Sequence, residues 1–181
     1  MLNYNQALPD KKLFQGLQMK EIKPIMKLII RGNKREFISA IGKSLNMLLP
    51  TEANTSTQSD KLTALWLSSD EWMIFSNEPV DESTNSYDTE QLLNNKISKL
   101  NLGAITDVTD QFVMINLRGN KIFDLFERGS PFNFNDFQNR KGAVIQTILT
   151  KIDVIVHNYD KNSVNLFVRR SFSQHLYSWM N

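Results

Sequence analysis

The stretch from Ala104 to Ser130, AITDVTDQFVMINLRGNKIFDLFERGS, predicts a strand, a tight turn and an amphipathic helix in succession. Positions 113, 115 and 117 within Val113–Leu117 are large and apolar, and this period of two is typical of a half-buried strand. Gly119 allows a tight turn because it has no Cβ atom. The apolar residues of Ile122–Phe126 then share one helical face, and Gly129 is expected to end that helix.

The same pattern occurs 87 positions earlier. Arg31-Gly32-Asn33-Lys34 corresponds to Arg118-Gly119-Asn120-Lys121, and Gly42 corresponds to Gly129. The sequence therefore predicts an internal repeat with halves at residues 16–103 and 104–181, each a strand–helix–strand–strand–helix unit. This predicts an α+β fold made of two ferredoxin-like (βαββαβ-type) halves within a single domain, residues 1–181. Residues 1–15 are polar and are expected to be flexible.

The charge of the chain is balanced overall but uneven along its length. The formal net charge is +2, from 21 basic and 19 acidic residues, and residues 62–95 contain no Lys or Arg. This acidic segment is either a solvated loop and helix start or a face complementary to a basic partner. A basic stripe interleaved with aromatic residues, which nucleic-acid binding would need, is not seen, so no nucleic-acid partner is expected.

The sequence shows no recognisable catalytic or metal-binding motif. It contains no Cys, which excludes disulfides, thiolate zinc sites and Cys nucleophiles within this chain. His157 and His175 have no ligand partners at metal-binding spacing, and no phosphate-binding glycine loop or nucleophile elbow occurs. We therefore expect no catalytic, cofactor or metal residues. No apolar segment is long enough to suggest a membrane span, and a cytoplasmic location is expected.

Two features allow more than one interpretation. Arg118-Gly119-Asn120 could bind an anion at a helix N-terminus, but its copy in the repeat favours a turn role. Trp66 and Trp72 flank a predicted hairpin turn and either pack in the core or anchor a protein partner.

Several segments, taken in order, resemble the gamma subunit of heterotetrameric sarcosine oxidase. Residues 65–72 (LWLSSDEW) resemble its Leu-Trp-Leu-Gly-Pro-Asp-Glu-Trp hairpin, with Ser68-Ser69 in place of Gly-Pro. Residues 106–110 (TDVTD) match its Thr-Asp-Val-Ser-Asp strand, and residues 129–131 (GSP) resemble its Gly-Cys-Pro turn. Gln146-Thr147, residues 167–172 (FVRRSF) and Trp179 extend the resemblance over most of residues 16–180.

The resemblance implies a fold, a complex and its cofactors. The family's fold is similar to the folate-binding region of aminomethyltransferase, the glycine-cleavage T-protein. In the complex that the family implies, the alpha, beta and delta subunits carry FAD, FMN, NAD, the tetrahydrofolate site and zinc, and the gamma subunit is noncatalytic. The complex converts sarcosine to glycine and passes the one-carbon unit to tetrahydrofolate. This chain would then be a structural subunit whose partners are the alpha, beta and delta subunits.

The alternative hypothesis is a stand-alone folate-binding protein related to aminomethyltransferase, and a small-molecule enzyme of another type also remains open. Asp153 lies near the position where the aminomethyltransferase relatives have a folate-contacting carboxylate, so it is the candidate ligand residue under that hypothesis. Under the first hypothesis, function depends on subunit contacts, which favour aromatic and Arg residues. The predicted interface residues are Trp72, Phe132, Phe134, Phe137, Arg169 and Arg170. The three Phe residues lie in an Asn-rich loop that either folds onto the core or docks on a partner.

Overall fold

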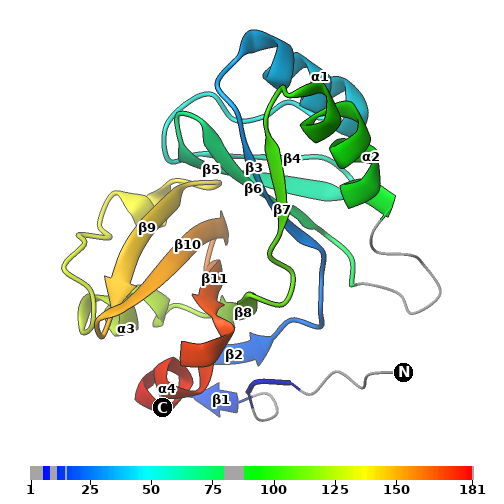
Figure 1. Cartoon of the computed structure of the whole chain (residues 1–181). Coiled ribbons are helices and arrows are strands. Elements are labelled where there is room, and N and C mark those ends of the chain that lie inside the picture. The colour runs from blue at the N-terminus through cyan, green and yellow to red at the C-terminus, as the bar shows by residue number, and fades with distance from the viewer. Residues whose placement is uncertain (1–5, 9–11, 15, 80–87, 181) are drawn as a thin grey trace. The chain divides into compact units, whose positions relative to one another are not determined.

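The computed structural model of the protein describes residues 6–8, 12–14, 16–79 and 88–180. The chain divides into two compact units (Figure 1). Residues 25–109 form one unit, and residues 1–24 together with 110–181 form the other. Each unit contains an antiparallel sheet and helices, so the predicted α+β class is confirmed.

The unit formed by residues 25–109 contains a five-stranded sheet in the order β4-β5-β6-β3-β7. Its elements are β3 (Lys27–Arg31), α1 (Arg35–Leu45), β4 (Ser56–Gln58), β5 (Leu62–Ser68), β6 (Glu71–Ser76), α2 (Asp88–Lys96), a 3₁₀ turn (Ser98–Leu100) and β7 (Ala104–Asp107). The succession β3–α1–β5–β6–α2–β7 is that of a ferredoxin-like unit, and β4 is added at one edge.

Apolar side chains of α1 and α2 cover one face of this sheet, and the two helices lie side by side (Figure 1). Phe37 and Ile41 of α1 are fully buried, and the rings of Phe37 and Trp72 lie 6.1 Å apart. Leu93 of α2 and the adjacent Ile97 complete the cluster. Phe37 and Ile41 are four residues apart, as are Leu93 and Ile97, so each segment has apolar side chains at helical spacing, which favours a helix with one buried face.

The second unit contains a six-stranded sheet in the order β1-β2-β8-β11-β10-β9. Its elements are β1 (Lys12–Phe14), β2 (Leu17–Glu21), β8 (Phe112–Arg118), α3 (Ile122–Glu127), a 3₁₀ turn (Phe137–Asn139), β9 (Val144–Leu149), β10 (Ile152–Asp160), β11 (Ser163–Arg169) and α4 (Arg170–Met180). Alternate residues of β8, β10 and β11 form one core with α3 and α4. The helices therefore cover one face of the sheet, and the intervening residues lie on the other face.

The strand that begins each half of the repeat belongs to the sheet of the other half. β2 pairs with β8, from Gln18 opposite Arg118 to Glu21 opposite Ile115. β7, which lies 87 positions after β2, pairs instead with β3. The predicted boundaries at residues 16–103 and 104–181 therefore differ from those of the two units. A repeat identified along the sequence carries no information on which copy of a strand completes which sheet.

The apolar segment 143–156 is too long for a single ordinary strand, which predicts a bend or hairpin within it, and it forms the β9–β10 hairpin. Thr150 and Lys151 connect the strands, with positive φ angles of 49° and 70°. Two successive residues in this conformation form the two-residue hairpin turn that matches the natural twist of the strands.

The glycines of the repeat have different roles. Gly119 has φ +134°, and a Cβ atom there would clash with the carbonyl oxygen of Gly16, so the predicted need for Gly in this turn is explained. The prediction that Gly42 ends its helix is wrong, because α1 continues to Leu45 and Asn46 takes the left-handed conformation. Gly129 lies just after α3, and a Cβ atom there would be 2.6 Å from the Trp179 ring.

Two further expectations need correction. Leu8 is buried and its N–H donates to Glu21 Oε2 at 2.8 Å, and β1 pairs with β2, so residues 6–8 and 12–14 are not a flexible arm. The rest of the segment 1–15 lies outside the described residues. Phe172, Leu176 and Trp179 were expected to form the inward face of the last helix; Leu176 is buried and Trp179 packs against the core, but Phe172 is 49% exposed. The buried residues of this helix are Ser173, Leu176, Tyr177 and Met180.

Candidate functional site: a hollow at the end of the six-stranded sheet

A concave hollow of about 540 Å³ lies in the second unit. It is lined by residues of four neighbouring strands: Phe112, Gln146, Thr147, Ile148, Asp153, Val154, Ile155 and Arg169. Ile148 of β9 lies opposite Asp153 of β10, and Arg169 of β11 lies opposite Phe112 of β8. Val154 pairs with Val168, so Asp153 and Arg169 occupy the next facing positions. Four side chains thus form one row across the sheet, on the face not covered by α3 and α4.

This row combines apolar surface with two opposite charges. Asp153 and Arg169 are both exposed, and within the described residues neither forms an ion pair or side-chain hydrogen bond. Phe112 is half-buried and Ile148 is 38% exposed. The hollow can therefore receive a group that has an apolar body and a polar end, and either charge is available to meet that end.

The Phe-rich loop folds onto the core of its own unit. Phe134 is fully buried, Phe137 is 6% exposed and Phe132 is half-buried. Ring centroids of these three residues lie 4.9 to 5.9 Å apart, and Phe134 also contacts Phe126 of α3 at 5.4 Å. Of the two alternatives for this loop, core packing is the one observed. This corrects the expectation that Phe134 and Phe137 are interface anchors.

Buried Asn158 of β10 holds this loop in place. Its side-chain amide donates to the carbonyl oxygens of Phe137, Gln138 and Arg140 at 2.8, 3.3 and 2.9 Å. Because each of these carbonyls belongs to the loop, one amide group fixes the aromatic cluster against the sheet.

Trp72 is likewise a core residue, with 2% of its surface exposed. Its indole N–H donates to the carbonyl oxygen of Pro50 at 2.9 Å, so its polar atom is satisfied within the chain. The expectation that Trp72 anchors a partner is corrected accordingly. Arg169 is exposed and lines the hollow, and Arg170 is half-buried at the start of α4. For these two residues and for Phe132, an interface role stays a prediction.

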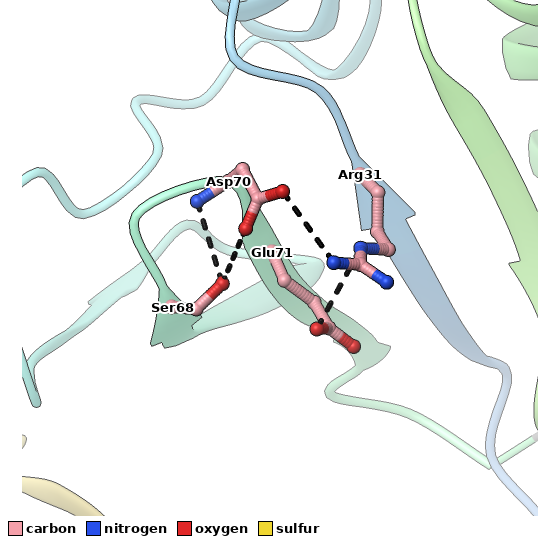
Figure 2. Close-up of polar contacts among 4 residues, drawn as sticks. All are labelled: Arg31, Ser68, Asp70 and Glu71. Carbon is pink, nitrogen blue, oxygen red and sulfur yellow. Dashed lines mark hydrogen bonds and ion pairs between the residues drawn. The ribbon is translucent and has the colours of Figure 1, made fainter.

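The tip of the β5–β6 hairpin is tied to the end of β3 by charged groups (Figure 2). Arg31 Nη2 lies 3.4 Å from Asp70 Oδ2, and Arg31 Nε lies 3.7 Å from Glu71 Oε2. The Ser68 hydroxyl donates to Asp70 Oδ1 at 2.6 Å, and this bond, with the Arg31 guanidinium, lowers the pKa of Asp70. These two acidic residues therefore have a basic partner within the chain, whereas Asp81 and Glu82 lie outside the described residues.

The two His residues differ in environment. His157 is 3% exposed, and burial lowers the pKa of its imidazole to about 4, whereas His175 is exposed on α4. Among residues 6–8, 12–14, 16–79 and 88–180, no group of three or more metal-ligating side chains occurs. Over the same residues, no helix has the length and apolar character needed to cross a membrane.

A sequence profile of the sarcosine oxidase, gamma subunit family matches residues 31–181. The chain belongs to this family. The matched region contains elements of both units, from the end of β3 to α4, and includes every residue that lines the hollow. Membership confirms the family that the sequence motifs indicated. Comparison with curated protein sequences gives no match.

Solved structures show the fold of this gamma subunit family member. A chain of heterotetrameric sarcosine oxidase from Corynebacterium sp. U-96, in complex with pyrrole 2-carboxylate, superposes with a TM-score of 0.78 at 17% identity, covering 91% of this chain and 81% of that one. The glycine cleavage system aminomethyltransferase T from Bartonella henselae superposes with a TM-score of 0.61 at 10% identity, covering 91% of this chain and 45% of that one. The predicted similarity to the aminomethyltransferase fold is thus confirmed.

Sequence reasoning identified Asp153 and Arg169 for different reasons and did not connect them. It also missed Phe112 and Ile148 as lining residues. The signal lies in the pairing register, because Ile148, Asp153, Arg169 and Phe112 come together only when four strands are aligned. Alternation within each strand predicts which face a side chain occupies, but not its neighbours across the sheet.

Proposed function

We propose that this chain is the gamma subunit of a heterotetrameric sarcosine oxidase and has a structural or assembly role rather than a catalytic one. The observation that carries the proposal is the family match over residues 31–181, which contains elements of both units. The fold shared with a chain of a heterotetrameric sarcosine oxidase supports it. The partners are then the alpha, beta and delta subunits, and the complex demethylates sarcosine to glycine with transfer of the one-carbon unit to tetrahydrofolate.

A noncatalytic role is supported by the chemistry of the chain's own residues. The sequence has no Cys, and the imidazole of His157 is buried with a low pKa. The charged residues of the hollow, Asp153 and Arg169, have no His or Cys beside them in the lining. We therefore assign FAD, FMN, NAD, tetrahydrofolate and zinc to the other subunits.

The proposal is tested by producing the other subunits with and without this chain. Size-exclusion chromatography measures the yield of intact complex, and peroxide formation from sarcosine per bound flavin measures turnover. An assembly role predicts that omission lowers the yield, while turnover per flavin in any complex that remains is unchanged. If yield is unchanged and turnover per flavin falls, the chain contributes to catalysis. If the chain does not associate with the flavoprotein subunits, the proposed function is wrong.

A second candidate function is the binding of a folate-type ligand, and the position of Asp153 favours it. The side chain lines a hollow together with Phe112 and Arg169, which offers a carboxylate, an aromatic face and a cation to one ligand. Calorimetric titration of the isolated chain with tetrahydrofolate tests this function. Micromolar affinity that is lost in Asp153→Asn and retained in Asp136→Asn, an exposed carboxylate outside the hollow, would support it. No heat of binding in the parent chain would exclude it.

A further inference from the structure

The two charged residues that line the hollow face each other on neighbouring strands and do not pair. Val154 of β10 lies opposite Val168 of β11, which places Asp153 and Arg169 at the next facing positions. Facing residues of an antiparallel pair have Cβ atoms about 5 Å apart, so their side chains could meet. In the part of the chain that the structure describes, neither forms an ion pair or a side-chain hydrogen bond. The carboxylate and the guanidinium can therefore each receive a group from a ligand.

Apolar side chains flank these two charges on both sides. Ile148 of β9 lies next to Asp153 in the row, and Phe112 of β8 lies next to Arg169. Ile155, which is 6% exposed, also lines the hollow. An apolar surface beside a pair of charges favours a ligand that has an apolar body attached to a charged group.

The spacing of the charges suits a ligand that carries both signs close together. In an α-amino acid the ammonium and carboxylate groups are attached to the same carbon atom, so they span less than one strand spacing of about 4.8 Å. Such a group fits between Asp153 and Arg169. Its carboxylate accepts hydrogen bonds from the guanidinium, and its ammonium donates to the Asp153 carboxylate. A ligand with a single charge is attracted by one of these residues and repelled by the other.

The size and exposure of the hollow set the expected affinity. Its volume of about 540 Å³ leaves room for an apolar side chain beside the charged end of the ligand. Asp153 and Arg169 are both exposed, so water and salt screen the two ion pairs that the ligand would form. Binding in the millimolar range is therefore expected.

We infer that the hollow binds a zwitterionic amino acid with an apolar side chain, held by its carboxylate on Arg169 and by its amino group on Asp153. A zwitterion is the occupant because it satisfies both charges of the hollow at once. The inference depends on the hollow alone and does not require the proposed assembly. It also names a different class of ligand from the folate-type function considered above.

Three probes that share one apolar body test the inference. Phenylalanine carries both charges, hydrocinnamate carries only the carboxylate, and phenethylamine carries only the ammonium. Each is titrated into the isolated full chain, and amide NMR shifts give the affinity and the location of binding. Phenylalanine is expected to bind with a Kd of about 1 mM, at least about fivefold more tightly than either singly charged probe, and to shift amides of residues 146–148 and 153–155.

Two variants with matched controls assign the charges. Asp153→Asn and Arg169→Gln are each expected to weaken phenylalanine binding at least about fivefold, whereas the controls Asp136→Asn and Arg35→Gln are expected to leave it unchanged. The singly charged probes are expected to respond in opposite ways. Asp153→Asn removes a repulsion and tightens hydrocinnamate at least about twofold, and Arg169→Gln does the same for phenethylamine. All four positions are exposed, so melting temperatures near that of the parent are expected.

The outcomes are distinct from those for the proposed function. Phenylalanine binding no tighter than that of the singly charged probes, shifts confined to residues outside the hollow, or an equal response of all three probes to either variant overturns the inference. Binding of tetrahydrofolate without binding of phenylalanine favours the folate-type function and also overturns it. Failure of the chain to associate with the flavoprotein subunits refutes the proposed function and leaves this inference unaffected.

Discussion

Replacing His157 with Gln is expected to flatten the dependence of this chain's stability on pH between 7.5 and 5.0. His157 lies near the middle of β10, is 3% exposed, and has its ring centroid 6.0 Å from that of Tyr159. Burial penalises the charged imidazolium and lowers the pKa from the ordinary value of 6.5 to about 4. The folded chain therefore keeps this side chain neutral under conditions where the unfolded chain protonates it.

The sign and size of the effect follow from proton linkage. Above pH 6.5 the imidazole of His157 is neutral in both the folded and the unfolded chain, so it does not change the free energy of unfolding with pH. As pH falls below 6.5, the unfolded state gains a proton that the folded state does not, and the free energy of unfolding decreases. At pH 5.0 the loss is about 2 kcal/mol, and it reaches about 3 kcal/mol below pH 4. Since domains of this size are stable by about 5–15 kcal/mol, the loss is measurable.

Urea unfolding followed by the fluorescence of the three Trp residues measures this difference. The parent, His157→Gln and the control His175→Gln are each unfolded at pH 7.5 and pH 5.0. His175 is exposed, so its replacement is expected to preserve the pH dependence of the parent. The substitution at His157 also changes absolute stability, and only the difference between the two pH values is compared. Equal losses in the parent and in His157→Gln would refute the reasoning.

Three further predictions, which use four substitutions, test the packing described above. Asn158→Ala removes the donor shared by three loop carbonyls and is expected to lower the free energy of unfolding by about 3 kcal/mol, measured by urea titration. Gly119→Ala, at φ +134°, is expected to cost at least about 2 kcal/mol, whereas Gly42→Ala within α1 is expected to cost little or to stabilise; similar melting temperatures for the two variants would contradict this. Trp72→Phe leaves the Pro50 carbonyl without its donor and is expected to lower stability by about 2 kcal/mol, without loss of cooperative unfolding.

The local elements of this fold were predictable because each is encoded by neighbouring residues. Alternation from Val113 to Leu117 indicated β8, and the apolar segment from Ala143 to Val156 indicated a hairpin of β9 and β10. The turn of that hairpin has the sequence Thr150-Lys151 in place of the usual Asn-Gly or Asp-Gly, although both residues adopt positive φ angles. The existence of the hairpin was therefore clearer than its position.

The side chains that face inward were harder to predict where two stripes compete. On α4, Phe172 was expected in the core because it is aromatic, but it is exposed. The buried face instead includes Ser173, which lies at helical spacing from Leu176 and Tyr177 although its side chain is polar. The reverse problem occurred for Trp72 and Phe134, which looked like surface anchors beside polar residues and lie instead in large cores. Aromatic identity alone does not distinguish a hot spot at an interface from a core residue, because both environments favour large rings.

The exchange of β2 and β7 explains why the sequence repeat and the folding units do not coincide. Leu17 and Met19 of β2 are buried in the core that contains β8, although they belong to the first half of the repeat and β8 belongs to the second. β7, at the start of the second half, completes the sheet of β3 in the same way. Each sheet is therefore completed by a strand from the opposite half of the repeat. β2 of the first half pairs with β8 of the second, and β7 of the second half pairs with β3 of the first. The family match begins at Arg31, after β2, yet the six-stranded sheet that carries the hollow and β9 includes that earlier strand between β1 and β8.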